Sequence, residues 1–249
     1  MAMVVEPILL VRLIKLKMIK KKEIIKKSLS MSYSNWEMYS DYQYKGIIGK
    51  LMKFDHEKLE EDIPKKKYNK VLEIGPGPHP HLQYIKHDFG KYYILEKEKE
   101  IIKHYKKFKN KKIIVRNYKS NKIPFKNKFF DRIIMSHTLE HINFPESFIF
   151  DAMSKLKKGG ILSIALPTDP GLMWRIGRLF SKIFFIKDKR KISGDEYEYI
   201  NAKDHVNTIF ALYHIINFNY KKNSKIEKFL PFRIKFFDLN LFYNVHIIK

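Results

Sequence analysis

Apolar residues recur along the chain in short runs that polar, helix-like stretches separate. The runs are rich in β-branched and aromatic residues and occupy five segments: Lys70–Ile74, Tyr92–Leu95, Lys112–Val115, Phe129–Ser136 and Ile161–Pro167. Helical patterns or long connections lie between them: a stretch from Pro80, a charged stretch at Glu96–Lys107, and a helix that Pro145 opens and Gly159–Gly160 close. Strands that alternate with crossover connections predict a parallel sheet covered on both faces.

Three further segments flank this alternation. Apolar residues at helical spacing over Ser34–Glu61 predict one or two helices that lead into the core. The alternation stops beyond Pro167, and we expect a helical lid at about 168–217, because such insertions at the carboxyl edge of a sheet cover substrates. The tail, Arg233–Lys249, is interpreted as two strands around Asp238–Asn240.

Composition changes this picture little. The 249 residues fit one domain with an appendage, which we divide into a basic extension at 1–32 and a main domain at 33–249. Cysteine is absent, which excludes disulfides, thiolate nucleophiles and cysteine-ligated zinc and is compatible with a cytoplasmic location. The net charge of +24 comes mostly from scattered lysines, so a solvated surface is favoured over a nucleic-acid site, although nucleic acid stays an alternative partner.

The extension contains the most apolar stretch near the start of the chain. Within Glu6–Lys27, however, Arg12, Lys15 and Lys17 interrupt the apolar run, so no transmembrane span is expected. The basic residues follow the apolar run, unlike those of a signal peptide. The extension at 1–32 is expected to be disordered or helical. A basic amphipathic helix that lies on a membrane surface through 6–27 stays open, and so does a natural start at Met31.

The stretch "VLEIGPGPH", Val71–His79, carries the candidate chemistry. Gly75 and Gly77 are spaced like the start of a dinucleotide fingerprint, but its third glycine falls on Pro80. Prolines at 76, 78 and 80 remove N–H donors, which makes the loop a poor phosphate cradle. A nucleoside without phosphate, such as S-adenosyl-L-methionine, escapes this objection. Glu73 is placed to neutralise its ammonium group, and Glu96, after the second strand, to accept its ribose hydroxyls.

Four motifs resemble those of class I S-adenosylmethionine-dependent methyltransferases, in the small-molecule branch with Leu-Glu-His after the fourth strand. They are "VLEIGPGP", "ILE", "IPFKNKFFDRIIMSHTLEHI" and "LKKGGILSIALP", within residues 36–167. The resemblance implies a Rossmann-like, doubly wound α/β fold whose seven-stranded, mostly parallel sheet ends in an antiparallel C-terminal strand pair. It also implies that Gly75 and Gly77 wrap the methionine part of the cofactor, that Glu96 binds ribose, and that Ser136 and His137 lie beside the sulfonium.

This sequence departs from the family pattern at two places. His79 stands where the family has the third glycine of its loop. Lys119 and Ser120 stand where the family often has an acid or amide that holds the adenine amino group, so Ser120 or Asn121 is expected to take that role.

The stretch "SHTLEH" at 136–141 narrows the chemical class of the methyl acceptor, because the Asn/Asp-Pro-Pro-Tyr/Phe motif of enzymes that methylate exocyclic amines is missing there. The resemblance therefore implies a small-molecule hydroxyl of a sugar, lipid headgroup or other metabolite. His205 in the lid is the first candidate base, Tyr197 and Tyr199 are the second, and His137 is a further catalytic candidate. His137 and His141 do not form a His-Glu-x-x-His helix, so no metal is expected. An RNA methyltransferase and a non-catalytic binding protein remain the alternatives.

Overall fold

The computed structural model describes residues 44–105, 110–118, 122–187 and 194–249. All of them belong to one unit, Tyr42–Lys249. The predicted extension at 1–32 and the membrane-surface segment at 6–27 lie outside the described residues, and so do Ser120 and Asn121.

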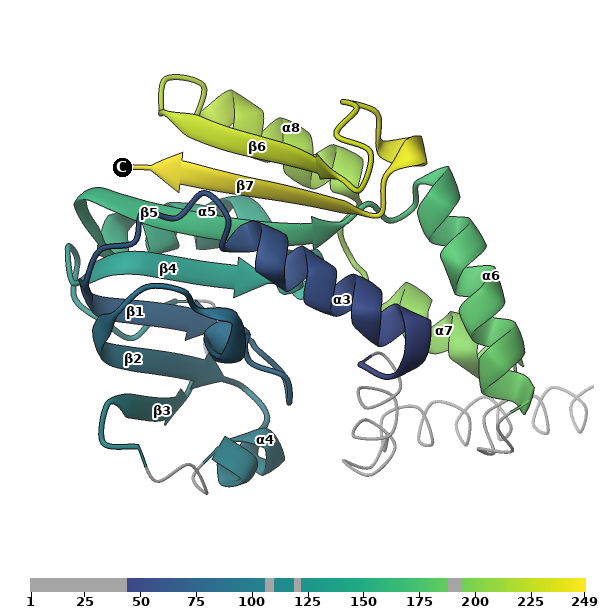
Figure 1. Cartoon of the computed structure of the whole chain (residues 1–249), viewed down its shortest axis with the longest axis horizontal. Coiled ribbons are helices and arrows are strands. Elements are labelled where there is room, and N and C mark those ends of the chain that lie inside the picture. The colour runs from purple at the N-terminus through teal and green to yellow at the C-terminus, as the bar shows by residue number, and fades with distance from the viewer. Residues whose placement is uncertain (1–43, 106–109, 119–121, 188–193) are drawn as a thin grey trace, which may run out of the picture. The chain divides into compact units, whose positions relative to one another are not determined.

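Seven strands form one sheet in the order β3-β2-β1-β4-β5-β7-β6 (Figure 1). The first five strands in this order are parallel, whereas β7 runs antiparallel to both of its neighbours. The strands are β1 (Tyr68–Ile74), β2 (Phe89–Glu96), β3 (Ile113–Asn117), β4 (Phe130–Ser136), β5 (Leu156–Pro167), β6 (Lys225–Leu230) and β7 (Phe242–Ile248). The predicted doubly wound sheet with an antiparallel C-terminal pair is confirmed.

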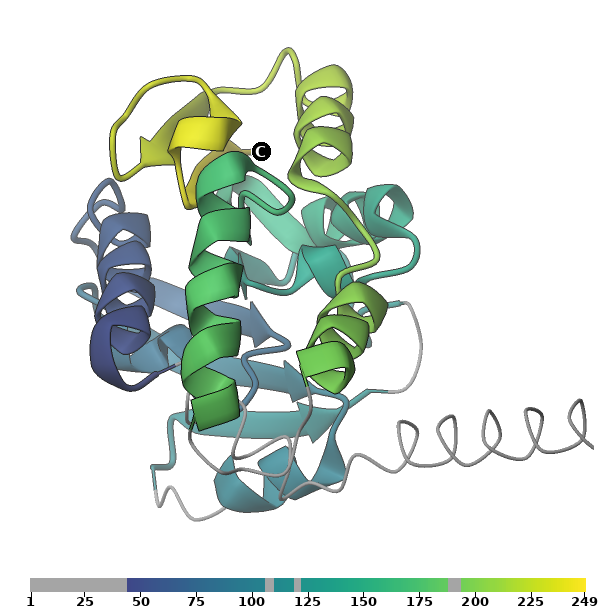
Figure 2. The ribbon, with the colours of Figure 1, turned by 90° about the vertical axis from the view of Figure 1, so that its right-hand side faces the viewer.

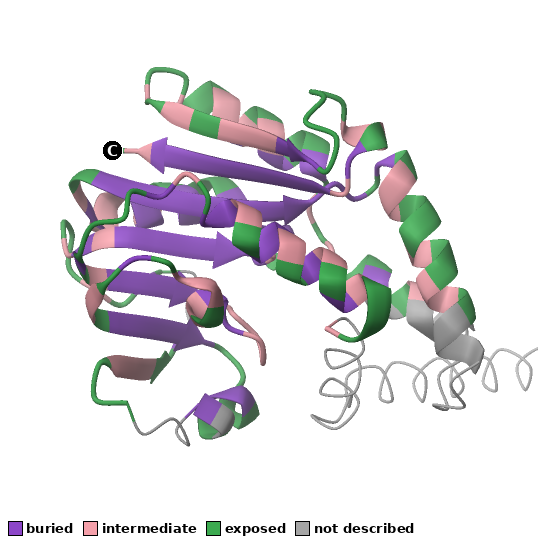
Figure 3. Ribbon diagram, viewed as in Figure 1, coloured by how far each residue is buried: buried purple, intermediate pink, exposed green. Residues whose placement is uncertain are grey.

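Helices cover both faces of this sheet, because its central strands are apolar on both sides (Figure 3). Figure 1 shows α3 (Gly46–Leu59) on one face and α5 (Pro145–Lys155) and α8 (Ile209–Asn219) on the other. Pro145 occupies the first turn of α5, as predicted. Since Ile209, Leu212 and Ile216 of α8 are buried in the main core, this part of the predicted lid packs against the sheet.

The predicted boundaries were wrong at three places. The helix expected from Pro80 is a single 3₁₀ turn, η1 (His81–Tyr84). The helix that Gly159–Gly160 were expected to close ends at Lys155. Both glycines lie in β5, which begins at Leu156 because this residue already pairs with Phe130. The partner of the last strand is β6, at Lys225–Leu230, whereas the expected strand after Arg233 is a loop with a 3₁₀ turn, η3 (Phe237–Leu239).

The carboxyl ends of the parallel strands point toward two further helices. Viewed from that edge, α6 (Leu172–Lys187) and α7 (Gly194–Asp204) stand in front of the sheet (Figure 2). The strand order reverses between β1 and β4, and this is the place where open α/β sheets bind ligands. Among the described residues, no helix is long and apolar enough to cross a membrane.

Candidate functional site

The loop after β1 has the backbone shape that its glycines predict. Gly75 and Gly77 have φ angles of +61° and +60°, in the left-handed region that favours glycine. The Gly75 N–H donates to the Leu95 carbonyl oxygen at 2.8 Å, and the Tyr105 hydroxyl donates to the Gly77 carbonyl oxygen. A Cβ at Gly75 would lie 2.8 Å from Thr138 Cγ2. The absence of a side chain at Gly75 therefore also makes room for Thr138, which follows β4.

Glu96 ends β2 and is tied to this loop. Its Oε2 accepts from the Gly77 N–H at 3.1 Å, and its Oε1 accepts from the Lys97 and Glu98 N–H groups at 2.6 and 3.1 Å. Burial raises the pKa of Glu96, although these three N–H donors oppose the shift. A carboxylate has about four acceptor sites, so one remains for a ribose hydroxyl. This carboxylate and the glycine loop fit S-adenosyl-L-methionine at the carboxyl ends of β1 and β2.

Glu73, near the end of β1, is buried. Its Oε1 accepts from the His81 N–H at 2.5 Å and its Oε2 from the Tyr92 hydroxyl at 2.7 Å. Burial raises the pKa of Glu73 to about 7. Both carboxylate oxygens therefore already hold η1 and β2 against β1, and contact with a ligand would need the remaining lone pairs.

Ser136 and His137, at the end of β4, face helix α3. His137 has a φ of +51°, and its Nε2 lies 2.9 Å from Asp55 Oδ2. Burial would lower the pKa of His137, but the hydrogen bond and charge of Asp55, with the charge of Glu140, raise it above its ordinary value. Ser136 Oγ lies 3.4 Å from His56 Nδ1. The sequence placed both residues at this edge but gave no sign of Asp55 or His56.

A second histidine and carboxylate face this edge from the lid side. His205, just after α7, has its Nδ1 2.7 Å from Oδ2 of Asp169, which follows β5. Burial would raise the pKa of Asp169, but the hydrogen bond and charge of His205 and the charge of Arg178 lower it, so the carboxylate stays ionised. Asp169 is separated from His205 by 36 residues and was not predicted.

Aromatic rings connect the two histidines. The Trp174 ring stacks on His205 with centroids 6.4 Å apart, and Phe242 lies against both Trp174 and His137, at 6.2 and 5.6 Å. Rings of this kind supply apolar walls on which an acceptor can pack. His137 and His205 thus belong to one edge of the sheet, each oriented by its own aspartate.

The two tyrosines predicted as second candidate bases make no described contact with His137 or His205. Tyr199 on α7 has an exposed side chain. Tyr197 lies on the same helix, but its side chain is outside the described part of the chain. No hydrogen bond in the described residues joins Tyr199 to either histidine.

A buried polar chain runs beneath the site from α3 into the sheet. The Tyr44 hydroxyl lies 3.1 Å from His56 Nε2, His56 Nδ1 lies 2.8 Å from His81 Nδ1, and His81 Nε2 lies 2.6 Å from Glu60 Oε1. Glu60 in turn pairs with Arg132 at 2.6 Å. Burial lowers the pKa values of both His56 and His81. We infer that this chain fixes α3 and the glycine loop relative to β4.

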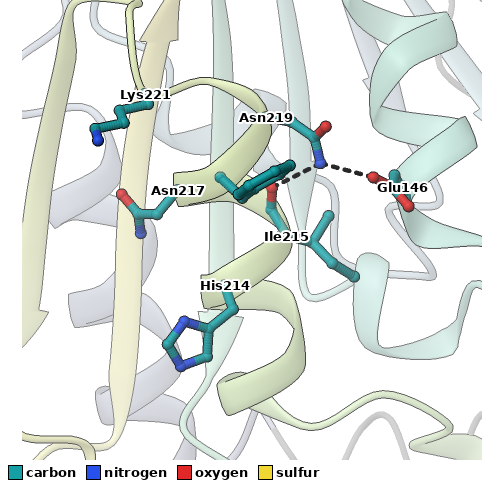
Figure 4. Close-up of a pocket in the computed structure, with 7 residues that line it drawn as sticks. Glu146, His214, Ile215, Asn217, Asn219 and Lys221 are labelled. Atoms are coloured by element: carbon teal, nitrogen blue, oxygen red, sulfur yellow. Dashed lines mark hydrogen bonds between the residues drawn. The ribbon is translucent and has the colours of Figure 1, made fainter.

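A separate surface hollow of about 570 Å³ lies beside the end of α8. Figure 4 shows Asn219 reaching from α8 to Glu146 at the start of α5, with Nδ2 2.8 Å from Oε1. The residues that line the hollow are Glu146, His214, Ile215, Asn217, Phe218, Asn219 and Lys221. None of them is a predicted site residue. We therefore place the candidate active site at the carboxyl edge of the sheet and not in this hollow.

Comparison with known proteins identifies the family of this chain. The family model described as "Methyltransferase domain" matches residues 44–212. This range covers more than half of the chain and includes the loop after β1, both histidines and Asp169. The chain therefore belongs to the methyltransferase-domain family. No curated protein matches it.

Solved structures share the fold at low sequence identity. The plantazolicin methyltransferase BpumL, in complex with SAH, is 14% identical with a TM-score of 0.62, over 94% of this chain and 97% of that one. A SAM-dependent methyltransferase from Aquifex aeolicus is 17% identical, over 84% and 97%, with a TM-score of 0.55. A possible histamine N-methyltransferase from Thermotoga maritima is 17% identical, over 91% and 99%, with a TM-score of 0.54.

Fold and family together define the class. The chain is a class I S-adenosylmethionine-dependent methyltransferase, as its motifs predicted, and S-adenosyl-L-methionine is its cofactor.

Proposed function

We propose that this methyltransferase acts on a hydroxyl group of a small molecule, such as a sugar, a lipid headgroup or another metabolite. The observation that carries the proposal is the pairing of Asp169 with His205 at the carboxyl edge of the sheet. A hydroxyl must lose a proton as it is methylated, and an imidazole oriented by a carboxylate is well suited to accept it.

The residues after β1 and β2 are the proposed cofactor contacts. Gly75 and Gly77 pass their backbone close to the methionine part, Glu96 accepts from the ribose, and Glu73 holds the loop in place. Ser136 and His137 lie beside the sulfonium, and Ser120 or Asn121 contacts the adenine. When bound, the cofactor supplies a methyl group already activated on a cationic sulfur.

His205 is the proposed base. Its Nδ1 faces the ionised Asp169, so Nε2 is the nitrogen that accepts the proton of the acceptor hydroxyl. Trp174 and Phe242 give the acceptor an apolar wall and exclude water from one side. His137 positions the reactants from the cofactor side, and Tyr197 and Tyr199 are second candidates for proton transfer.

RNA is less favoured as the acceptor because two basic side chains of α6, Arg178 and Lys182, are already paired with carboxylates. Arg178 lies 3.0 Å from Glu198 and 3.6 Å from Asp169, and Lys182 lies 3.4 Å from Glu198. Phosphate contacts would have to compete with these carboxylates.

The test is methyl transfer from labelled S-adenosylmethionine to a panel of hydroxyl metabolites, measured for the parent, His205→Ala and the control His214→Ala. We expect the first variant to lose about 10²–10⁴-fold in turnover while its affinity for S-adenosylhomocysteine is unchanged. The control lies on α8 in the hollow of Figure 4 and should match the parent. Transfer to RNA but to no small molecule, or full turnover by His205→Ala, would reject the proposal.

A further inference from the structure

Three side chains at the rim of the site converge without a common partner. Glu140, His141 and His205 each offer one ligand atom, and these atoms lie within 4.8 Å of one another. Glu140 and His141 belong to η2 (Leu139–His141), after β4, whereas His205 follows α7. The rings of the two histidines are 5.0 Å apart and nearly perpendicular.

Both imidazoles are oriented through the same nitrogen. His141 Nδ1 lies 2.7 Å from the Asp204 carbonyl oxygen, and His205 Nδ1 lies 2.7 Å from Asp169 Oδ2. Both partners are acceptors, so each Nδ1 carries the proton and each Nε2 keeps a free lone pair. Metal-binding histidines are held in this way, with the distal nitrogen fixed by a carbonyl or carboxylate.

Glu140 adds a negatively charged ligand to the two neutral imidazoles. Its side chain is 3% exposed, and its Oε2 is buried without a hydrogen-bond partner. Its other oxygen, Oε1, lies 3.8 Å from His141 Nε2 and 3.9 Å from His137 Nδ1. A buried carboxylate oxygen without a partner is costly, and a bound cation would remove that cost.

The backbone fixes the relative position of the three residues. The Val206 and Asn207 N–H groups donate to the Glu140 carbonyl oxygen at 2.9 and 3.1 Å. The Asn207 side-chain amide donates to the Leu139 and Ile142 carbonyl oxygens at 3.0 and 2.6 Å. Because the backbone is fixed, only the side chains need to move. Small side-chain rotations would bring the ligand atoms from within 4.8 Å of one another to the roughly 3.3 Å spacing that metal–nitrogen bonds of about 2.0–2.1 Å require.

We propose that Glu140, His141 and His205 bind one divalent first-row transition-metal cation, such as Zn²⁺ or Co²⁺. Two imidazoles and one carboxylate suit such ions and leave coordination positions open. His141 is 42% exposed, so the open side faces solvent or acceptor. The site goes beyond the proposed function, because it can load without cofactor or acceptor. It uses His205 Nε2, so the cation-loaded state and the free-base state exclude each other.

Binding to the full chain tests this proposal without any activity assay. Protein stripped with a chelator is titrated with Co²⁺ and followed by its visible absorption, and with Zn²⁺ by calorimetry. We expect one cation per parent chain. We expect His141→Ala and Glu140→Gln each to weaken binding at least tenfold, and Asp169→Asn to weaken it about 10–100-fold by loosening His205.

Two variants serve as controls for the titration. His214→Ala removes a histidine away from the cluster and should bind like the parent, with the same stoichiometry. His141 is partly exposed, so His141→Ala retains the fold, which a thermal unfolding scan verifies. The proposal is overturned by a parent that binds no stoichiometric cation, or by a folded His141→Ala that binds as tightly as the parent.

Discussion

Gly75 shows how one residue meets two requirements at once. Its φ of +61° needs a residue without the usual Cβ penalty, and a Cβ would lie 2.8 Å from Thr138 Cγ2. Gly159, at φ +71°, has nothing within 4 Å of its added Cβ. The two glycines therefore separate the backbone cost of a substitution from the steric cost.

We predict that Gly159→Ala lowers the free energy of unfolding by about 1–2 kcal/mol, the usual left-handed penalty. Gly75→Ala should cost about 1–3 kcal/mol more, because the methyl group overpacks against Thr138. Adding Thr138→Ser should recover most of that excess, measured against Thr138→Ser alone in urea unfolding. Equal costs for the two alanine variants would show that Thr138 does not constrain the loop.

At the scale of elements, the connection from α7 to α8 matters most, because it carries His205 to the site. The backbone of residues 206–207 and the Asn207 side chain bind it to η2, and Thr208 caps α8 by accepting from the Ala211 N–H at 3.2 Å. His205 is therefore held by these hydrogen bonds between elements as well as by its own helix, where its N–H donates to the Asn201 carbonyl oxygen at 3.1 Å.

We predict that Asn207→Ala lowers turnover about 10–100-fold by misplacing His205, while affinity for S-adenosylhomocysteine stays unchanged. The matched control is Asn219→Ala, whose amide also makes two hydrogen bonds but at the far end of α8. Steady-state kinetics and calorimetry on both variants check this. Similar turnover of the two variants would contradict the assigned role of Asn207.

The elements that the sequence predicted well are those with a local signal. The strands that became β1 to β5 are apolar runs, and Gly75 and Glu96 lie at positions that a short motif marks. The partner of β7 was misplaced, because the aromatic residues after Arg233 resemble a strand. The real strand, Lys225–Leu230, has charged residues at three of its six positions. Pairs such as Asp169–His205 and Asp55–His137 lay beyond prediction, because long loops and crossovers bring their members together.

At the scale of the whole molecule, buried titratable groups make stability depend on pH. Burial, with the charge of Arg132, lowers the pKa of His246 to about 3 from an ordinary 6.5. His246 Nδ1 lies 3.0 Å from Ser163 Oγ, which also accepts from Arg132 Nε. Between these two pKa values the unfolded chain binds a proton that the folded chain does not. The contribution of neutral His246 to the free energy of unfolding is therefore fully present above pH 6.5 and is lost progressively as the pH falls below it.

We predict that the difference in unfolding free energy between the parent and His246→Gln shrinks as the pH falls. The slope is about 1.4 kcal/mol per pH unit, which gives about 2 kcal/mol between pH 7.5 and pH 5. Chemical denaturation at several pH values, with both proteins in the same buffers, measures it. A difference that is constant with pH would show that folding does not shift the pKa of His246.

We expect the carboxyl ends of β1 and β2 to bind S-adenosylmethionine, and calorimetry with S-adenosylhomocysteine measures this binding. The parent should bind with one-to-one stoichiometry and should not bind NAD. Glu96→Ala should lose about 2–3 kcal/mol, or roughly 30- to 150-fold in affinity. The control Glu100→Ala, which removes an exposed carboxylate paired with Lys103 on α4 (Lys99–Tyr105), should bind like the parent. Tight NAD binding by the parent, or undiminished affinity in a folded Glu96→Ala protein, would show that Glu96 and the glycine loop do not form an S-adenosylmethionine site.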